Sequence, residues 1–213
     1  MGIAEKRNKL KEMRRQSILK AARKLFFEKG FRHVSVENIA KKANISKGAV
    51  YLHFKSKDEI YTHLLLSEVD RHQRIIKTIS ETTTDPFEAI KKIVDSYVNF
   101  FLVDPELFRI LMNYMLHPEH LELSKEMDEK LVKAVNENID TITHHLNVAV
   151  EKGTISRAVN IFYCRNAIWG MINGIIALHL FTGAEGRRAG RIRETVEQGI
   201  EIYLRGLQAD KLK

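Results

Sequence analysis

Apolar residues recur at the spacing of an α-helix along nearly the whole chain of 213 residues. From about Lys6 to Lys29, the apolar residues Ile18, Ala22 and Leu25 lie on one helical stripe, and Gly30 provides a stop signal. Ser35 and Ser46 are typical N-caps for two short helices, the second running from about Lys47 to Phe54. No stretch alternates apolar and polar positions between turn signals, so the pattern predicts an all-α protein.

The three prolines divide the remainder of the chain, because each one stands where a helix can begin. Asp85-Pro86, Asp104-Pro105 and His117-Pro118 each place Pro in a first turn, where its missing N–H costs nothing. Ser56 opens a long helix with Glu59 three residues later, which is the pattern of a capping box. The predicted helices of this part are about 57–82, 86–103, 105–116, 120–151, 159–182 and 191–208. We therefore expect about nine helices in all.

Positive charge is concentrated in the first quarter of the chain. Residues 1–60 contain 16 Lys and Arg against six acids, a net charge of +10, whereas the remainder of this +8 chain carries a net charge of −2. Such a segment attracts polyanions, although a basic solvated tail is an alternative that charge alone leaves open. Six basic residues precede the first apolar stripe: Lys6, Arg7, Lys9, Lys11, Arg14 and Arg15. They either contact a nucleic-acid backbone or form a frayed, solvated helix end.

The two short helices have the spacing of a helix-turn-helix. About eight residues, a tight turn through residues 43–46 and a second helix form this motif over about 35–54. The second helix is capped by Ser46 and offers Lys47, Gly48, Tyr51 and Lys55 on its outer face. A helix of this size fits the DNA major groove, and its N-terminal dipole and free N–H groups favour phosphate.

The residues that form this motif carry a family resemblance. The stretch from Ser35 to Ile60 (SVENIAKKANISKGAVYLHFKSKDEI) resembles the N-terminal signature of TetR-family transcriptional regulators, and Ala21 to Phe31 (AARKLFFEKGF) resembles the first helix of that family. The motif resemblance covers about residues 15–65. The resemblance implies that Ser35, Tyr51, His53 and Lys57 hold phosphates and that Lys47, Gly48 and Ala49 lie at the groove. The candidate DNA-binding set is Ser35, Ser46, Lys47, Gly48, Ala49, Tyr51, His53, Lys55 and Lys57.

Two of these residues also have simpler interpretations. Tyr51 is alternatively a packed aromatic residue of the small domain, and His53 an ordinary surface histidine. The resemblance assigns residues 1–57 to a DNA-binding domain and residues 58–213 to ligand binding and dimerisation.

The segment 166–184 contains no Lys, Arg, Asp or Glu, and its length approaches that of a membrane span. However, it includes Asn166, Asn173, His179 and three glycines, a polar load that makes a span marginal. A helix apolar on nearly every side is more simply buried against a partner subunit. The resemblance implies the same, because helices about 159–182 and 191–208 would form a four-helix dimer bundle. A dimer also presents two recognition helices to a palindrome.

The C-terminal helices carry many large apolar residues, and the resemblance implies that they enclose a small-molecule pocket. The candidate ligand-binding residues are Phe101, Phe108, Met112, Met115, His145, Trp169 and Asn173. For each of them a plain core role is the alternative. The aromatic load favours an apolar or amphipathic effector.

The sequence contains no motif for metal binding or for catalysis. The histidines and the single Cys164 have no metal-ligand spacing, so neither a metal nor another cofactor is predicted. No Gly-rich phosphate loop or nucleophile motif indicates an enzyme. The N-terminus is basic but lacks an apolar signal core, which favours a cytoplasmic protein.

The sequence therefore predicts a homodimeric, ligand-responsive transcription factor, most simply a repressor. It would bind a palindromic duplex operator and be released by a small effector. The alternatives are a DNA-organising dimer without an effector and a membrane-associated basic helical protein.

Overall fold

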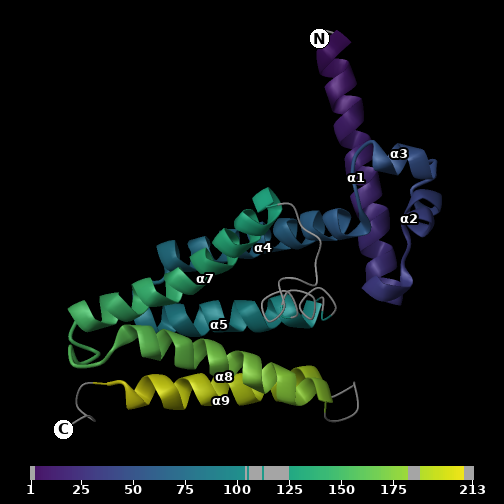
Figure 1. The fold of residues 1–213 in the computed structure, drawn as a ribbon. Coiled ribbons are helices and arrows are strands. Elements are labelled where there is room, and N and C mark those ends of the chain that lie inside the picture. The colour runs from purple at the N-terminus through teal and green to yellow at the C-terminus, as the bar shows by residue number, and fades with distance from the viewer. Residues whose placement is uncertain (1–2, 104, 106–111, 113–124, 182–187, 209–213) are drawn as a thin grey trace. The chain divides into compact units, whose positions relative to one another are not determined.

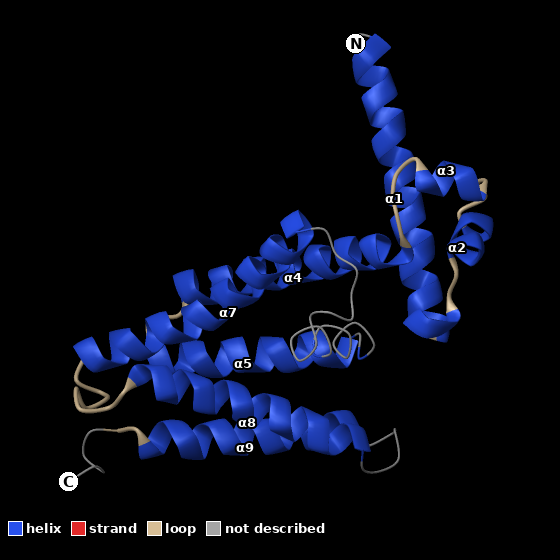
Figure 2. Ribbon diagram, viewed as in Figure 1, coloured by secondary structure: helices blue, strands red, loops and turns tan. Residues whose placement is uncertain are grey.

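The structure is a computed structural model that describes residues 3–103, 105, 112, 125–181 and 188–208. Apart from turns and an isolated bridge between Ile155 and Gln208, the described elements are all helical, which confirms the predicted all-α class (Figures 1 and 2). The helices are α1 (Ile3–Lys29), α2 (Val36–Lys42), α3 (Lys47–Tyr51), α4 (Lys57–Thr82), α5 (Pro86–Val103), α7 (Lys125–Glu151), α8 (Ile161–Phe181) and α9 (Arg188–Gly206), with a 3-10 turn η1 (Phe31–His33) after α1.

Most predicted boundaries lie within two or three residues of the observed ones, and the difference at the end of α3 has a clear cause. Helix α3 ends at Tyr51 and not at Phe54, because the chain turns there and buries Phe54 completely in the core. Helix α9 begins at Arg188, three residues before the predicted start at about residue 191. The predicted helix 105–116 lies outside the described residues except for Pro105 and Met112, which are both helical, and residues 120–124 also lie outside them.

Local capping explains where the helices start and stop. Asn38 N–H donates to Ser35 Oγ at 3.1 Å, and Glu88 N–H donates to Asp85 Oδ1 at 2.8 Å. Ser56 also caps its helix through Glu59 N–H, but the Glu59 carboxylate accepts from Lys55 N–H instead of closing the box. Gly30, which follows α1, and Gly153, which follows α7, adopt positive φ angles of 75° and 74°, as glycine does most readily.

The chain packs as two compact units, and the division falls within α4, between Glu68 and Val69, and again within α7, between Leu131 and Val132. The first unit contains α1, η1, α2, α3, the first half of α4 and the start of α7 up to Leu131. Its core is an apolar cluster completed by the rings of Phe26, Phe31 and Tyr61, whose centroids lie 4.8–5.6 Å apart. The first turns of α4 thus pack with the N-terminal helices.

The second unit is built around α5, which buries ten of its residues. Helix α9 packs against both α5 and α8. The unit also buries polar side chains that the helical pattern did not single out, among them His72 of α4 and Tyr97 of α5. Both are hydrogen-bonded, as buried polar groups need to be, and they recur in the ligand analysis below.

Candidate nucleic-acid interface

The turn between α2 and α3 has the geometry of a helix-turn-helix. Asn44 takes a left-handed φ of 57°, a conformation that Asn tolerates better than most residues, and Ile45 N–H donates to Ala40 O at 3.0 Å. Ile39, Ala40 and Val50 are buried between the helices, and the opposite face of α3 is left at the surface. One face of α3 is therefore packed against the protein, and the other is open to solvent.

The two serines of the predicted set act first as helix caps. Ser35 Oγ accepts from Asn38 N–H and donates to Asn38 Oδ1 at 2.9 Å, while the Asn38 side chain accepts from Ser35 N–H. Ser46 Oγ accepts from Ala49 N–H at 3.1 Å. Both serines are exposed, so they fix the starts of α2 and α3 at the surface that faces solvent. Their contact with phosphate stays a prediction.

The outer face of α3 carries free polar groups. Tyr51 is 48 % exposed, and Lys47 and Lys55 are exposed without an ion pair among the described residues. Gly48 is also exposed, and a Cβ atom added there would meet only Ser46 Oγ, at an ordinary 3.9 Å. The chain itself therefore has room for a side chain at position 48. Ala49 is half-buried, behind this face.

Two residues of the predicted phosphate-binding set, Lys57 and His53, are half-buried. Lys57 Nζ donates to Phe31 O at 3.0 Å and lies 4.1 Å from the centre of the Phe31 ring. His53 is half-buried, and its Nδ1 is buried with no hydrogen-bond partner among the described residues. Burial lowers the pKa of His53, and Lys11, Arg14 and Arg15 lower it further. His53 thus lies in a positive environment with an unused ring nitrogen.

Contacts between α1 and α4 hold this domain together, and the sequence analysis did not find them. Arg23 forms a 2.7 Å ion pair with Glu68, and the Arg15 guanidinium donates to His63 Nδ1 at 2.9 Å. Burial and the positive charge of Arg15 lower the pKa of His63, which keeps the ring nitrogen available as an acceptor. No local motif announces pairs that are 45 and 48 residues apart.

In the second unit, two of the predicted ligand residues come together. Tyr97 OH donates to Asn173 Oδ1 at 2.9 Å, and the Tyr97 and Trp169 rings lie 4.9 Å apart. His72 stacks on Phe100 at 5.4 Å next to them, and its Nε2 lies 3.0 Å from Ser96 Oγ. We call Tyr97, Trp169, Asn173 and His72 the Tyr97 cluster. Burial raises the pKa of Tyr97 and lowers that of His72, so both are neutral.

The other predicted ligand residues are not part of this cluster. Phe101 is fully buried and packs as core, and His145 Nε2 lies 2.9 Å from Ser80 Oγ. Met112 is half-buried, and Phe108 and Met115 lie outside the described residues.

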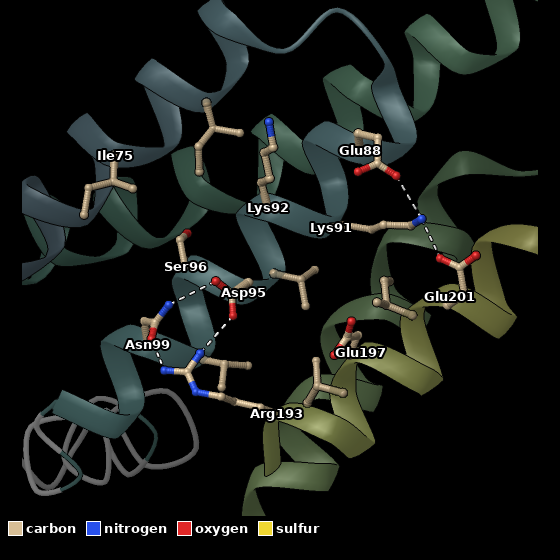
Figure 3. A pocket seen from close by; sticks show the side chains of 15 residues that line it. Ile75, Glu88, Lys91, Lys92, Asp95, Ser96, Asn99, Arg193, Glu197 and Glu201 are labelled. Atoms are coloured by element: carbon tan, nitrogen blue, oxygen red, sulfur yellow. Dashed lines mark hydrogen bonds and ion pairs between the residues drawn. The ribbon is translucent and has the colours of Figure 1, made fainter. Parts of the chain in front are cut away.

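A separate cavity of about 730 Å³ opens between α4, α5 and α9 (Figure 3). Apolar residues of all three helices line it, and charged pairs cross it from α5 to α9. Lys91 lies between Glu88 and Glu201, and Arg193 pairs with Asp95 at 3.0 Å and also contacts Asn99. None of the five predicted ligand residues that the structure describes lines this cavity. It was missed because its walls come from segments about 100 residues apart.

Helix α8 exposes much of its apolar surface. By length and composition, residues Ile161–His179 could cross a membrane, and 22 % of that stretch is buried within the chain. Tyr163 and Leu178 of α8 are 69 % and 59 % exposed, and Ile202 of α9 is 69 % exposed. Large apolar side chains gathered on neighbouring helices indicate a surface that a partner covers.

Comparison with known proteins places these observations in a family. The family described as "Bacterial regulatory proteins, tetR family" matches residues 18–64, which include the helix-turn-helix. The chain is 31 % identical to the transposon Tn10 TetC protein of Escherichia coli over 58 % of this chain and 71 % of that protein. It is 26 % identical to the fatty acid metabolism regulator protein of Bacillus subtilis, with 78 % and 82 % covered.

A solved structure supports the same assignment. The TetR-family regulator PfmR from Thermus thermophilus is 26 % identical, covers 90 % of this chain with 98 % of its own, and superimposes with a TM-score of 0.69. The Bacillus subtilis protein and PfmR are both named as regulators. The exposed, capped helix α3 agrees with the matched motif, and the all-helical fold agrees with the superposition. The chain belongs to the TetR family of bacterial regulatory proteins, which are DNA-binding transcriptional regulators.

Proposed function

We propose that this protein is a homodimeric repressor that binds a palindromic operator through α3 and is released by a small apolar or amphipathic effector. The observation that carries the proposal is the outer face of α3, where Lys47, Tyr51 and Gly48 are exposed and unpaired while the opposite face is buried. Helices presented in this way enter the major groove, with their N-terminal residues nearest to the base edges.

The individual side chains have different roles in this proposal. Lys47 lies in the first turn of α3 and donates to base edges or to phosphate, while the Tyr51 hydroxyl, one turn later, donates to the DNA backbone. The absent side chain of Gly48 allows the backbone to come close to the DNA, since nothing in the protein itself requires glycine there. The phosphate contact proposed for His53 would require its ring to turn outward, because Nδ1 is buried in the free protein.

Dimerisation through α8 and α9 would cover the exposed apolar side chains Tyr163, Leu178 and Ile202. A twofold dimer supplies two copies of α3, whose half-sites would lie about 34–36 Å apart or at a multiple of that distance. Dimerisation through this surface would explain why α8 has the composition of a membrane span in a chain that also contains a DNA-binding domain.

The effector is proposed to bind in the second unit, at the Tyr97 cluster. Asn173 and Trp169 are only half-buried, whereas Tyr97 behind them is buried, so a ligand could stack on the indole and exchange hydrogen bonds with the amide. Acyl compounds are the first class to test, because one relative regulates fatty acid metabolism. Binding would change the separation of the two α3 helices and so weaken the match to the half-sites.

The DNA part of the proposal is tested by selecting binders from a random duplex pool and titrating the winner by fluorescence anisotropy. We expect a twofold-symmetric sequence, bound at least about a thousandfold more tightly than random duplex. Tyr51→Phe should weaken binding by removing one hydroxyl contact, and Lys47→Ala should weaken it further, whereas the matched control Lys29→Ala at the end of α1 should bind like the parent. Equal affinities for all duplexes would instead favour the DNA-organising dimer.

The effector part is tested with fatty acids of increasing chain length. A compound that binds should raise the melting temperature and lower the affinity for the selected operator, and Asn173→Leu should reduce both effects. If compounds bind and leave the DNA affinity unchanged, the proposed regulation is wrong. Transcription in vitro from a promoter that contains the operator should fall on addition of the protein; a rise would identify an activator.

A further inference from the structure

The first half of α1 extends beyond the small domain that it helps to build. Burial in α1 begins at Ile18, and residues 5–14 are all exposed. The family match also begins at residue 18, so this segment is additional to the matched motif. Figure 1 shows the N-terminal part of α1 continuing past α2 and α3. We call residues 3–15 the α1 extension.

One face of α1 is apolar in the small domain and basic in the α1 extension. Ile18, Ala22 and Leu25 form the buried stripe, with spacings of four and three residues. Continued toward the N-terminus with the same spacing, this stripe is occupied by Arg14, Lys11 and Arg7. The face that packs on the domain core is therefore continued by a row of three cations, which we call the basic stripe.

The basic stripe faces the side of the domain where the proposed DNA contacts lie. Lys11 and Arg14 are close enough to His53 to depress its pKa, together with Arg15. Arg15, next to the stripe, lies 5.4 Å from the centre of the Phe54 ring, three residues after the end of α3. The positive field of the stripe thus reaches His53, which follows α3 in the chain.

No acidic side chain in the described part of the chain pairs with these three cations. Glu12 contacts Arg15 and Gln16 instead. Seven residues separate Arg7 from Arg14, which corresponds to about 10 Å along a helix. One strand of B-DNA carries about three phosphates over that length. Number, spacing and sign of the charges therefore match a segment of DNA backbone.

We propose that Arg7, Lys11 and Arg14 bind backbone phosphates of duplex DNA that flanks the half-site contacted by α3. The inference rests on the proposed function, because it takes the position of the DNA from α3. It adds a second contact surface, which lengthens the DNA site beyond the base pairs that α3 reads and contributes affinity without sequence preference.

The test compares two triple variants of one helix. The first is Arg7→Gln, Lys11→Gln and Arg14→Gln. The matched control is Lys6→Gln, Lys9→Gln and Lys20→Gln, which removes the same charge from the opposite face. Each protein is titrated with the selected operator as a minimal duplex and as a duplex that is about six base pairs longer at each end.

We expect the longer duplex to bind the parent and the control more tightly than the minimal duplex, and the stripe variant to bind both duplexes equally. Raising the salt from 50 to 200 mM weakens the binding of the parent, and the loss of three phosphate contacts should make that weakening about 40-fold smaller for each α1 extension. If the stripe variant and the control gain equally from the longer duplex, the inference is wrong, while the role of α3 stands.

Failure of the proposed function gives a different result. If the parent selects no sequence, the salt dependence on random duplex still compares the stripe variant with the control, and equal slopes overturn the inference. A parent that binds no duplex overturns both proposals. Circular dichroism confirms folding for each variant, and the single substitution Arg7→Gln, the most distant from the core, should give a partial effect in the same direction.

Discussion

Acidification should destabilise this protein through His72, a histidine held neutral in the core of the second unit. The ring is buried, it stacks on Phe100, and its Nε2 lies 3.0 Å from Ser96 Oγ. Burial lowers the pKa of His72 to about 4, against 6.5 for an unperturbed histidine. Protons therefore bind the unfolded chain more tightly than the folded one, and stability must fall as the pH drops below 6.5.

The size of the effect follows from the two pKa values. The full difference of 2.5 units corresponds to about 3.4 kcal/mol, reached only below pH 4, where the folded ring is also protonated. At pH 5 the unfolded ring is almost fully protonated and the folded ring almost fully neutral, so this residue alone should cost about 2 kcal/mol relative to pH 7.5.

Urea unfolding followed by circular dichroism, at one protein concentration and at several pH values between 7.5 and 5, measures this loss. His72→Gln lacks the ionisable ring and should be less stable than the parent at pH 7.5, yet lose about 2 kcal/mol less on going to pH 5. His33→Gln, at an exposed position, is the control and should keep the pH dependence of the parent. A constant stability difference between parent and His72→Gln across this range would refute the reasoning.

Three further outcomes follow from the structure. Gly48→Ala should leave the fold intact or stabilise it by up to about 1 kcal/mol, yet weaken operator binding about tenfold or more, as thermal melts and anisotropy would show. Arg23→Met should cost about 1–2 kcal/mol in urea unfolding, because it leaves the buried Glu68 carboxylate without its 2.7 Å ion pair, although Arg23 itself is half exposed. Leu178→Glu should convert the proposed dimer to monomers in analytical ultracentrifugation, whereas Val103→Glu, equally exposed outside α8 and α9, should not.

Each of these three has an outcome that would contradict it. Unchanged DNA affinity of Gly48→Ala would show that α3 does not approach the DNA closely at that position. Unchanged stability of Arg23→Met would show that other interactions of Glu68 suffice. A dimer that survives Leu178→Glu would place the subunit interface elsewhere than the exposed apolar face of α8.

The sequence by itself determined where most of the helices begin and end. Ser35, Ser46 and Asp85 cap helices through hydrogen bonds that span only three residues, and Gly30 ends α1 through its own backbone freedom. Such signals are complete within a few consecutive residues, so a linear reading finds them. The helix-turn-helix was found for the same reason, because its short helices and its turn are contiguous.

The tertiary structure alone decided which side chains meet across the chain. Tyr97 pairs with Asn173, and Arg23 pairs with Glu68, although each helix face offered several partners of the same kind. It placed Lys57 against Phe31, and it built a cavity from α4, α5 and α9. Helical periodicity tells which face of a helix is buried but not which helix covers it. That choice depends on the packing of all the helices together, and no local segment contains it.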